Sequence, residues 1–210
     1  MATIRGILGV IEGSAGSSTF STLNGRNILR QKVGSNGSNS VPQQRTRNQF
    51  KALAALHKAG LGTATRAGLL KQNGKSSYNR FVGLNFGTAT SADVNTAVAT
   101  VDFAKVVVSA GSVLGTTGLS ATAGAGTVAF AFGNNTDGVS GLALDKVTVV
   151  VVNKLTNLAY SATGAVRTAG TQALAVPGLT AATKASYAAY AFFKRADGSD
   201  ASLTAYVALL

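Results

Sequence analysis

The sequence predicts a mainly β protein with a helical insert, on three observations. From about residue 101 onward, short apolar or alternating segments are separated by Gly- and Asn-rich turns, as in antiparallel sheets. Residues 18–33 contain two alternating stretches around Asn24-Gly25, a strong hairpin signal. Between these parts, residues 42–59 have apolar positions at helical spacing. The 210 residues are 46% hydrophobic, with 25 Gly and no Trp, so we expect a packed core of mostly small side chains.

Residues 1–100 are expected to form an N-terminal region made of the hairpin, a polar linker, one or two helices and a connector. The linker is the stretch "GSNGSNS" at 34–40. Pro42 suits the first turn of a helix, because its missing N–H costs nothing there, and Gly60 is expected to end that helix. A second, weaker helix is expected at about 63–72, then a turn within "NGKSSYNRF" and a connector at 87–100.

The first helix is predicted to be amphipathic. At about 100° per residue, Phe50, Leu53 and Leu56 share one arc. The basic residues of this helix that lie in a narrow stripe away from that arc are Arg47, Lys51 and Lys58.

Residues 101–210 are predicted to form one antiparallel β-sandwich of immunoglobulin-like type, with about seven strands. The Cys and Trp pattern of true immunoglobulin domains is missing, so this prediction concerns architecture alone, and a jelly roll remains the alternative. The expected strands are 104–109, 127–132, 146–152, 157–162, 171–176, 186–194 and 202–209.

The net charge of +12 is concentrated in the first part of the chain. Twelve of the 19 basic residues and only one acidic residue, Glu12, lie in residues 1–86, while the remainder is almost neutral. Such asymmetry favours a partner that is nucleic acid or an anionic membrane surface. No run approaches the roughly 18 apolar residues of a membrane span, and the run at 6–11 is short for a signal peptide. We therefore expect synthesis in the cytoplasm without a signal peptide.

Few residues support catalysis, so we expect no enzyme, no catalytic residue, no metal site and no cofactor. The absence of Cys excludes disulfides, thiolate metal sites and Cys nucleophiles. His57 is the single histidine, and we interpret it as a residue at the edge of a packed helix face. The stretch "QNGKSS" at 72–77 lacks the first Gly of a phosphate-binding loop and is interpreted as a turn. "GNNTDG" at 133–138 has some calcium-loop character but no bidentate Glu, and is interpreted as a loop between strands.

A basic segment is the remaining candidate site. Eight cations occur within residues 45–80, which contain no acidic residue. Such a segment would bind nucleic acid by neutralising phosphates, without reading sequence, and nearby aromatic rings would offer stacking faces to single strands. The simpler interpretation is a solvated basic face with core aromatics, and a membrane-surface role would need a larger apolar face. The predicted nucleic-acid-binding residues are Arg45, Arg47, Lys51, Lys58, Arg66, Lys71, Lys75 and Arg80, and the candidate stacking residues are Phe50, Tyr78, Phe81 and Phe86.

The chain resembles an uncharacterised protein family, a domain of unknown function common in Bacteroidota and their phages. The stretches that carry the resemblance are "GILG" with "GSAGSSTFSTLNGRNILRQKVG" within 6–34, "SVPQQRTRNQF" at 40–50, "YNRFVGLN" at 78–85 and "KVVVSAGSV" at 105–113. Family members usually have Asn-Pro-Arg-Thr before the glutamines, whereas Ser40-Val41-Pro42 precedes them here. The resemblance implies an N-terminal β and helical region with an immunoglobulin-like C-terminal domain, and no particular activity.

Together these observations favour a structural virion protein. We expect a self-assembling coat protein of a Bacteroidota phage, located in the virion. Its expected partners are copies of itself and, as a second candidate, nucleic acid bound without sequence specificity. The basic N-terminal region would then contact the genome or neighbouring subunits. The alternatives are a soluble, non-sequence-specific nucleic-acid-binding accessory protein and an immunoglobulin-like decoration or adhesion module.

Overall fold

The computed structural model describes residues 3–4, 11–23, 26–32, 34 and 39–210, and it divides the chain into two compact units, Met1–Ser40 and Val41–Leu210. The first unit contains β1 (Thr3–Ile4), β2 (Ile11–Ala15), β3 (Ser18–Leu23) and β4 (Arg26–Gln31), which form one sheet in that order. The predicted hairpin is confirmed as the antiparallel pair β3–β4, and its turn at 24–25 lies outside the described residues, as does most of the linker.

A bent helical segment opens the second unit. Helix α1 (Val41–Leu56) continues through a π-helical turn (His57–Leu61) into α2 (Gly62–Gly68). Pro42 lies in the first turn of α1, as predicted. The helical φ and ψ angles break at Ala59 and Gly60, so the first helix ends there as predicted and a second helical stretch follows this kink directly. The φ of Gly60 is 118°, which suits glycine, and a Cβ there would lie 2.5 Å from the carbonyl oxygen of Ala159.

Two antiparallel sheets form the body of the second unit. One has the order β10 (Ala159–Val166), β9 (Lys146–Asn153), β12 (Tyr187–Lys194) and β13 (Ala205–Val207). The other has the order β11 (Thr171–Ala175), β8 (Thr127–Gly133) and β7 (Thr117–Ala123). The described part of the protein is therefore mainly β, with antiparallel sheets and one joined helical segment.

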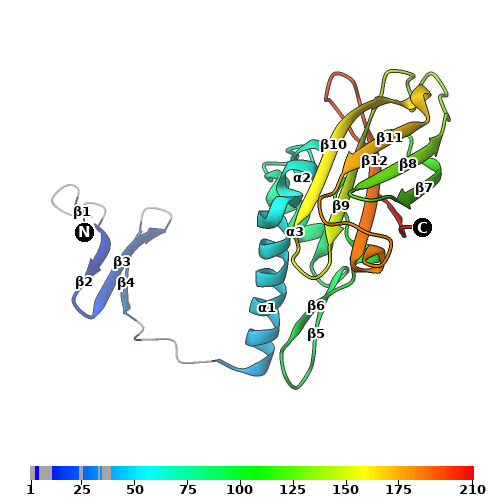
Figure 1. Ribbon diagram of the computed structural model, residues 1–210. Coiled ribbons are helices and arrows are strands. Elements are labelled where there is room, and N and C mark those ends of the chain that lie inside the picture. The colour runs from blue at the N-terminus through cyan, green and yellow to red at the C-terminus, as the bar shows by residue number, and fades with distance from the viewer. Residues whose placement is uncertain (1–2, 5–10, 24–25, 33, 35–38) are drawn as a thin grey trace. The chain divides into compact units, whose positions relative to one another are not determined.

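The sheet of β10, β9, β12 and β13 is buried on both faces. Val147, Val149 and Val151 of β9 belong to a hydrophobic cluster with side chains of β8 and β11. Val150 and Val152 of the same strand belong to a second cluster, which includes side chains of α1, α2 and the later helix α3 (Ser77–Asn85). Figure 1 shows these helices on the side of the sheet opposite β7, β8 and β11. This double burial explains the run of four valines at 149–152 in β9.

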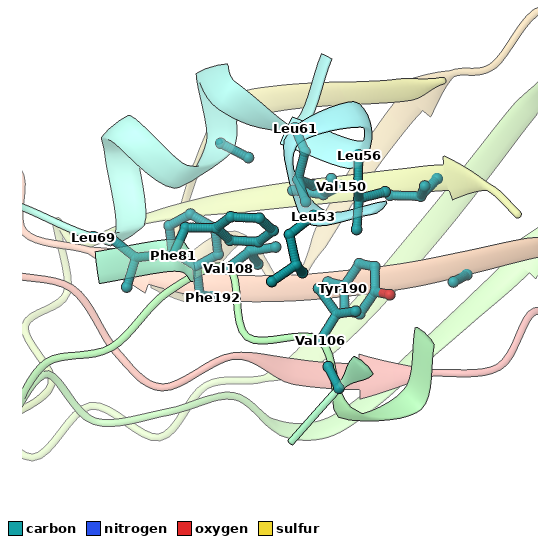
Figure 2. Packing of buried hydrophobic residues seen from close by; sticks show 14 of the residues in the cluster. Leu53, Leu56, Leu61, Leu69, Phe81, Val106, Val108, Val150, Tyr190 and Phe192 are labelled. Carbon is teal, nitrogen blue, oxygen red and sulfur yellow. The ribbon is translucent and has the colours of Figure 1, made fainter. Parts of the chain in front are cut away.

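The helix-side cluster fixes the helices against the sheet. Figure 2 shows Leu53, Leu56 and Leu61 of the helical segment over Val150 of β9 and Tyr190 of β12. The Tyr190 hydroxyl donates a hydrogen bond of 2.6 Å to the carbonyl oxygen of Phe103, so its one polar atom is satisfied. Desolvation by burial raises the pKa of Tyr190, which keeps the phenol neutral. Phe50, predicted on the same arc as Leu53, is 45% exposed.

The two sheets are connected along both sides. Leu209 forms a parallel bridge with Ala121 of β7, which joins the C-terminal residues to the three-stranded sheet. On the other side, the Gln172 side chain of β11 accepts a hydrogen bond of 2.8 Å from the Ala165 amide of β10. Strands β10, β13, β11 and β7 remain the edge strands of the two sheets.

Five of the predicted strands correspond to observed strands, and two predictions need correction. The segment 104–109 is not a strand: it begins with a 3₁₀ turn at Phe103–Lys105 and continues without a partner strand. The Asn85 side-chain amide pairs with both backbone groups of Val107, and Thr204 Oγ1 accepts from the amides of Val108 and Ser109. Side chains thus replace the hydrogen bonds of a sheet. The strand expected at 202–209 is confined to β13.

Several elements were not predicted. Helix α3 occupies part of "NGKSSYNRF", where only a turn was expected, and Ser76 caps it by accepting a hydrogen bond from the Asn79 amide. The expected connector at 87–100 contains the hairpin β5 (Thr90–Ala92) and β6 (Ala99–Val101). Strand β7 was not expected either. The helices and the C-terminal sheets belong to one compact unit, whereas the sequence interpretation placed a boundary at residue 100.

Candidate nucleic-acid interface

Four adjoining hollows surround α2, α3 and the turn between them, with volumes of about 470, 340, 270 and 220 Å³. Neighbouring hollows share lining residues, and we treat the four together as one surface. Its basic lining residues are five of the eight predicted cations, and we call this surface the basic groove: Lys58, Arg66, Lys71, Lys75 and Arg80.

The local structure explains how these cations are presented. Lys58 lies in the π-helical turn and Arg66 in the last turn of α2, and both are exposed. Lys71 and Lys75 flank a tight turn in which Gln72 and Lys75 exchange backbone hydrogen bonds. Gly74 has a φ of 71° in that turn, a conformation that favours glycine. The prediction of a turn at 72–77 is confirmed for this part.

Arg80 has a structural role as well as a place in the groove. Its half-buried guanidinium donates through Nη1 to the Leu70 carbonyl oxygen, at 2.5 Å, and through Nη2 to that of Ala110, at 3.5 Å. It therefore ties the segment after α2 to the segment that follows Val108. Arg80 contributes charge to the groove from a fixed position.

The other three predicted cations lie on α1 and line none of the four hollows. The Arg45 Nε donates a hydrogen bond of 3.3 Å to the Ala92 carbonyl oxygen of the β5–β6 hairpin. Arg47 and Lys51 are exposed on the same helix. Arg45 therefore supports the packing of the hairpin, and the eight predicted residues divide into a groove set and an α1 set.

The basic groove contains little opposing charge. Within the described part of the chain, Asp200 is the one acidic residue among those lining the four hollows. Its carboxylate accepts hydrogen bonds from the Ser112 hydroxyl, at 2.5 Å, and from the amides of Ser112 and Ala201. Asp200 is thus held by its own neighbours, and five cationic residues and one carboxylate line the groove.

The candidate stacking aromatics differ in accessibility. Phe50 and Phe86 stack on each other with ring centroids 4.6 Å apart, and Phe81 is fully buried. Tyr78 is 39% exposed and lines the groove. Tyr78 is therefore the candidate that presents its ring to a ligand in the groove.

His57 lies where the sequence interpretation expected it, at the edge of the packed helix face. It is half-buried, with its ring 4.9 Å from that of Tyr78 and 5.6 Å from that of Phe81. Burial, followed by the nearby charge of Arg66, lowers its pKa from the usual 6.5. His57 is therefore neutral at physiological pH and acts as an aromatic packing group.

The described residues contain no group of three His, Cys, Asp or Glu side chains that could hold a metal ion. In the loop at 133–138, Asp137 Oδ1 accepts hydrogen bonds from the amides of Val139 and Gly141. These backbone hydrogen bonds lower the pKa of Asp137. The carboxylate thus stabilises the loop, in keeping with the interpretation of this stretch as a connection between strands.

A buried ionic network was missed by the sequence analysis. Arg167 and Asp145 have no exposed side-chain surface and form an ion pair of 3.1 Å, and Arg195 contacts the same carboxylate at 3.4 Å. The Arg167 guanidinium also lies 3.8 Å from the centroid of the Phe193 ring and donates to Asn135 Oδ1 at 2.6 Å. The network fixes the loop before β9 to the ends of β10 and β12. No local pattern in the sequence marks a buried arginine.

Comparison with protein families, with curated proteins and with solved structures gives no match to this chain. None of the helices in the described part of the chain is both long and apolar enough to cross a membrane. The groove's geometry and charge therefore carry the functional argument.

Proposed function

We propose that this chain is a structural protein that assembles with copies of itself and contacts nucleic acid through the basic groove, as the coat protein of a bacteriophage does. The observation that carries the proposal is the clustering of five cations along adjoining hollows whose single acidic residue is already engaged. A continuous cationic groove follows a phosphate backbone without reading bases. The resemblance to a family found in Bacteroidota phages agrees with this role, and the virion is then its place of action.

Self-assembly draws support from the first unit. None of the side chains whose burial is described there is buried, and Leu29, opposite Phe20 in the β3–β4 pair, is 64% exposed. For the side chains of this 40-residue unit whose burial is described, the sheet gains little from burial to offset its ordering entropy. Contact with further protein surface would supply the missing burial, and a coat offers that surface in every copy.

We also propose that the two sheets of the second unit form an immunoglobulin-like sandwich. If β7 to β13 are lettered A, B, C, C′, E, F and G, one sheet has the order A-B-E and the other C′-C-F-G. Immunoglobulin sandwiches share this division, with the fourth strand beside either E or C. In this chain the helices cover the outer face of the larger sheet, which is an addition to that architecture.

The binding part of the proposal is tested by salt-dependent affinity. If the five groove cations each neutralise one phosphate of a single strand, a plot of log K against log salt has a slope of about −3.5. The variant Lys58→Glu, Arg66→Glu, Lys71→Glu should lose most of this affinity. A matched control with the same change in net charge, Lys146→Glu, Lys154→Glu, Lys184→Glu, should keep it. Equal loss in both variants would show that net charge alone, and no groove, governs binding.

The assembly part is tested by negative-stain microscopy and light scattering of the purified chain. Regular large particles support a coat protein. Small species that bind nucleic acid in a salt-dependent way would favour the accessory protein, the alternative that uses the same groove without assembly.

A further inference from the structure

One hollow of the basic groove differs from the others in its lining. This hollow of about 220 Å³ lies between α2 and the start of α3 and is lined by His57, Arg66, Lys71, Ser76, Ser77 and Tyr78. It is the one of the four hollows that combines cations with an exposed six-membered aromatic ring. We call it the Tyr78 hollow.

The Tyr78 ring is held in place by a series of aromatic contacts. Phe81, one turn further along α3, is anchored in the helix-side core with no exposed surface. The His57 ring contacts both, with its centroid 5.6 Å from that of Phe81 at 45° and 4.9 Å from that of Tyr78 at 70°. Because Tyr78 already has a supported position, it loses little side-chain entropy when a ligand stacks on it.

The cations of the hollow are available to phosphate. Arg66 and Lys71 are exposed, and neither belongs to an ion pair in the part of the chain that the structure describes. Arg66 lies close enough to His57 to influence its protonation. The first turn of α3, capped by Ser76, adds the positive end of a helix dipole beside them. The hollow thus offers a mostly apolar surface at an aromatic ring, with two cationic side chains among the residues that line it.

This combination matches the chemistry of an unpaired nucleotide. Bases within a duplex are stacked on their neighbours and reach such a hollow only after unpairing, whereas bases of a single strand are free to stack on a protein ring. Every base has a π-face, so one ring accepts any of them, while flanking cations hold the phosphates on either side.

We infer that the Tyr78 hollow seats one unstacked base of a single-stranded nucleic acid against Tyr78, with Arg66 and Lys71 neutralising the flanking phosphates. The inference rests on the proposed function and names its ligand class: the groove discriminates in favour of single strands over duplexes.

The inference is tested with three ligands of 12 nucleotides in fluorescence anisotropy: oligothymidylate, the same backbone with abasic sites, and a duplex. The wild-type chain should bind oligothymidylate more tightly than the other two. Tyr78→Ala should weaken oligothymidylate binding by about 5- to 150-fold, the range that corresponds to loss of one stacked base, and Tyr78→Phe should retain it. Equal binding of the abasic strand, or unchanged binding by Tyr78→Ala, would overturn the inference.

A second readout locates the base. Because His57 is the single histidine, its imidazole proton signals are unambiguous in an NMR spectrum. These signals should shift when oligothymidylate is added and stay in place with the abasic strand. Phe50→Ala, which alters an exposed ring that lines none of the four hollows, serves as the control and should bind as the wild type does. A wild-type spectrum that responds equally to both strands would contradict base seating.

The variant Lys58→Glu, Arg66→Glu, Lys71→Glu distinguishes failure of the base-binding inference from failure of the proposed function. If that variant loses affinity while Tyr78→Ala does not, the groove proposal stands and the base seat is wrong. If the groove variant binds as tightly as its matched control, the proposed function itself fails.

Discussion

Replacing Asp145 with alanine should be among the most destabilising single changes in this protein. The substitution removes the one carboxylate that contacts Arg167, whose side chain has no exposed surface. The guanidinium would keep its hydrogen bonds to Asn135 and to the Leu114 carbonyl oxygen, but would be left as a buried charge without a counter-charge.

The expected cost is large in relation to typical stability. Breaking a buried ion pair by removing one partner costs about 3–5 kcal/mol. Single domains are stable by about 5–15 kcal/mol, so Asp145→Ala should remove about a fifth of the total or more. Arg167→Met should cost less, because Asp145 would retain the 3.4 Å contact with Arg195 and the hydrogen bond from the Leu142 amide.

Urea unfolding of the full chain, followed by circular dichroism, measures these differences. The double variant Asp145→Ala, Arg167→Met should be less destabilised than the sum of its two single variants, because it leaves no unpaired buried charge in that pair. If Asp145→Ala lies within about 1 kcal/mol of the wild type, a typical value for exposed ion pairs, the account of the network is wrong.

Three further predictions concern the helical segment. Gly60→Ala should destabilise the fold by about 1–3 kcal/mol or more in the same unfolding assay, because the φ of Gly60 is positive and a Cβ would contact the facing carbonyl oxygen of Ala159. The control is Gly83→Ala in α3, where a Cβ meets open space. It should be neutral or stabilising by up to about 1 kcal/mol. Leu53→Ala should lower the free energy of unfolding by about 2–5 kcal/mol, because it leaves a cavity in the core. Phe50→Ala should lower it clearly less, because the Phe50 ring is 45% exposed. Equal losses in the two variants would contradict the burial of Leu53. Because burial lowers the pKa of His57, the unfolded chain takes up its proton first as pH falls, so stability should rise with pH from the lowered pKa up to about 6.5 and level off above it. Melting temperatures between pH 5 and 8 would show this step in the wild type, and its persistence in His57→Phe would refute the assignment.

The sequence predicted those elements whose signals are local. Strands β9 and β12 were located because their apolar runs are bounded by turns, and α1 because of Pro42 and its apolar spacing. Strand β7 was missed because "TGLSATA" consists mostly of small residues with little periodicity. The segment 104–109 was misassigned because its backbone partners, Asn85 and Thr204, are distant side chains that no local pattern identifies.

The candidate site was also predictable in part, as far as its signal is local in the sequence. A count of charges along the chain found all five groove cations. It could not separate Arg45, which hydrogen-bonds a hairpin carbonyl, from Arg66, which lines the groove. Nor could it show that Phe81 is buried while Tyr78, three residues earlier, is accessible. Those distinctions arise from how α2 and α3 pack on the sheet.

The most direct test of the central claim is sedimentation of the purified chain in dilute buffer, recorded at both 260 and 280 nm with added nucleic acid. We expect a fast-sedimenting species, far larger than the 21.1 kDa chain, that carries absorbance from nucleic acid and releases it as salt increases. A single slow species of one chain, with all the nucleic acid sedimenting separately, would contradict the account.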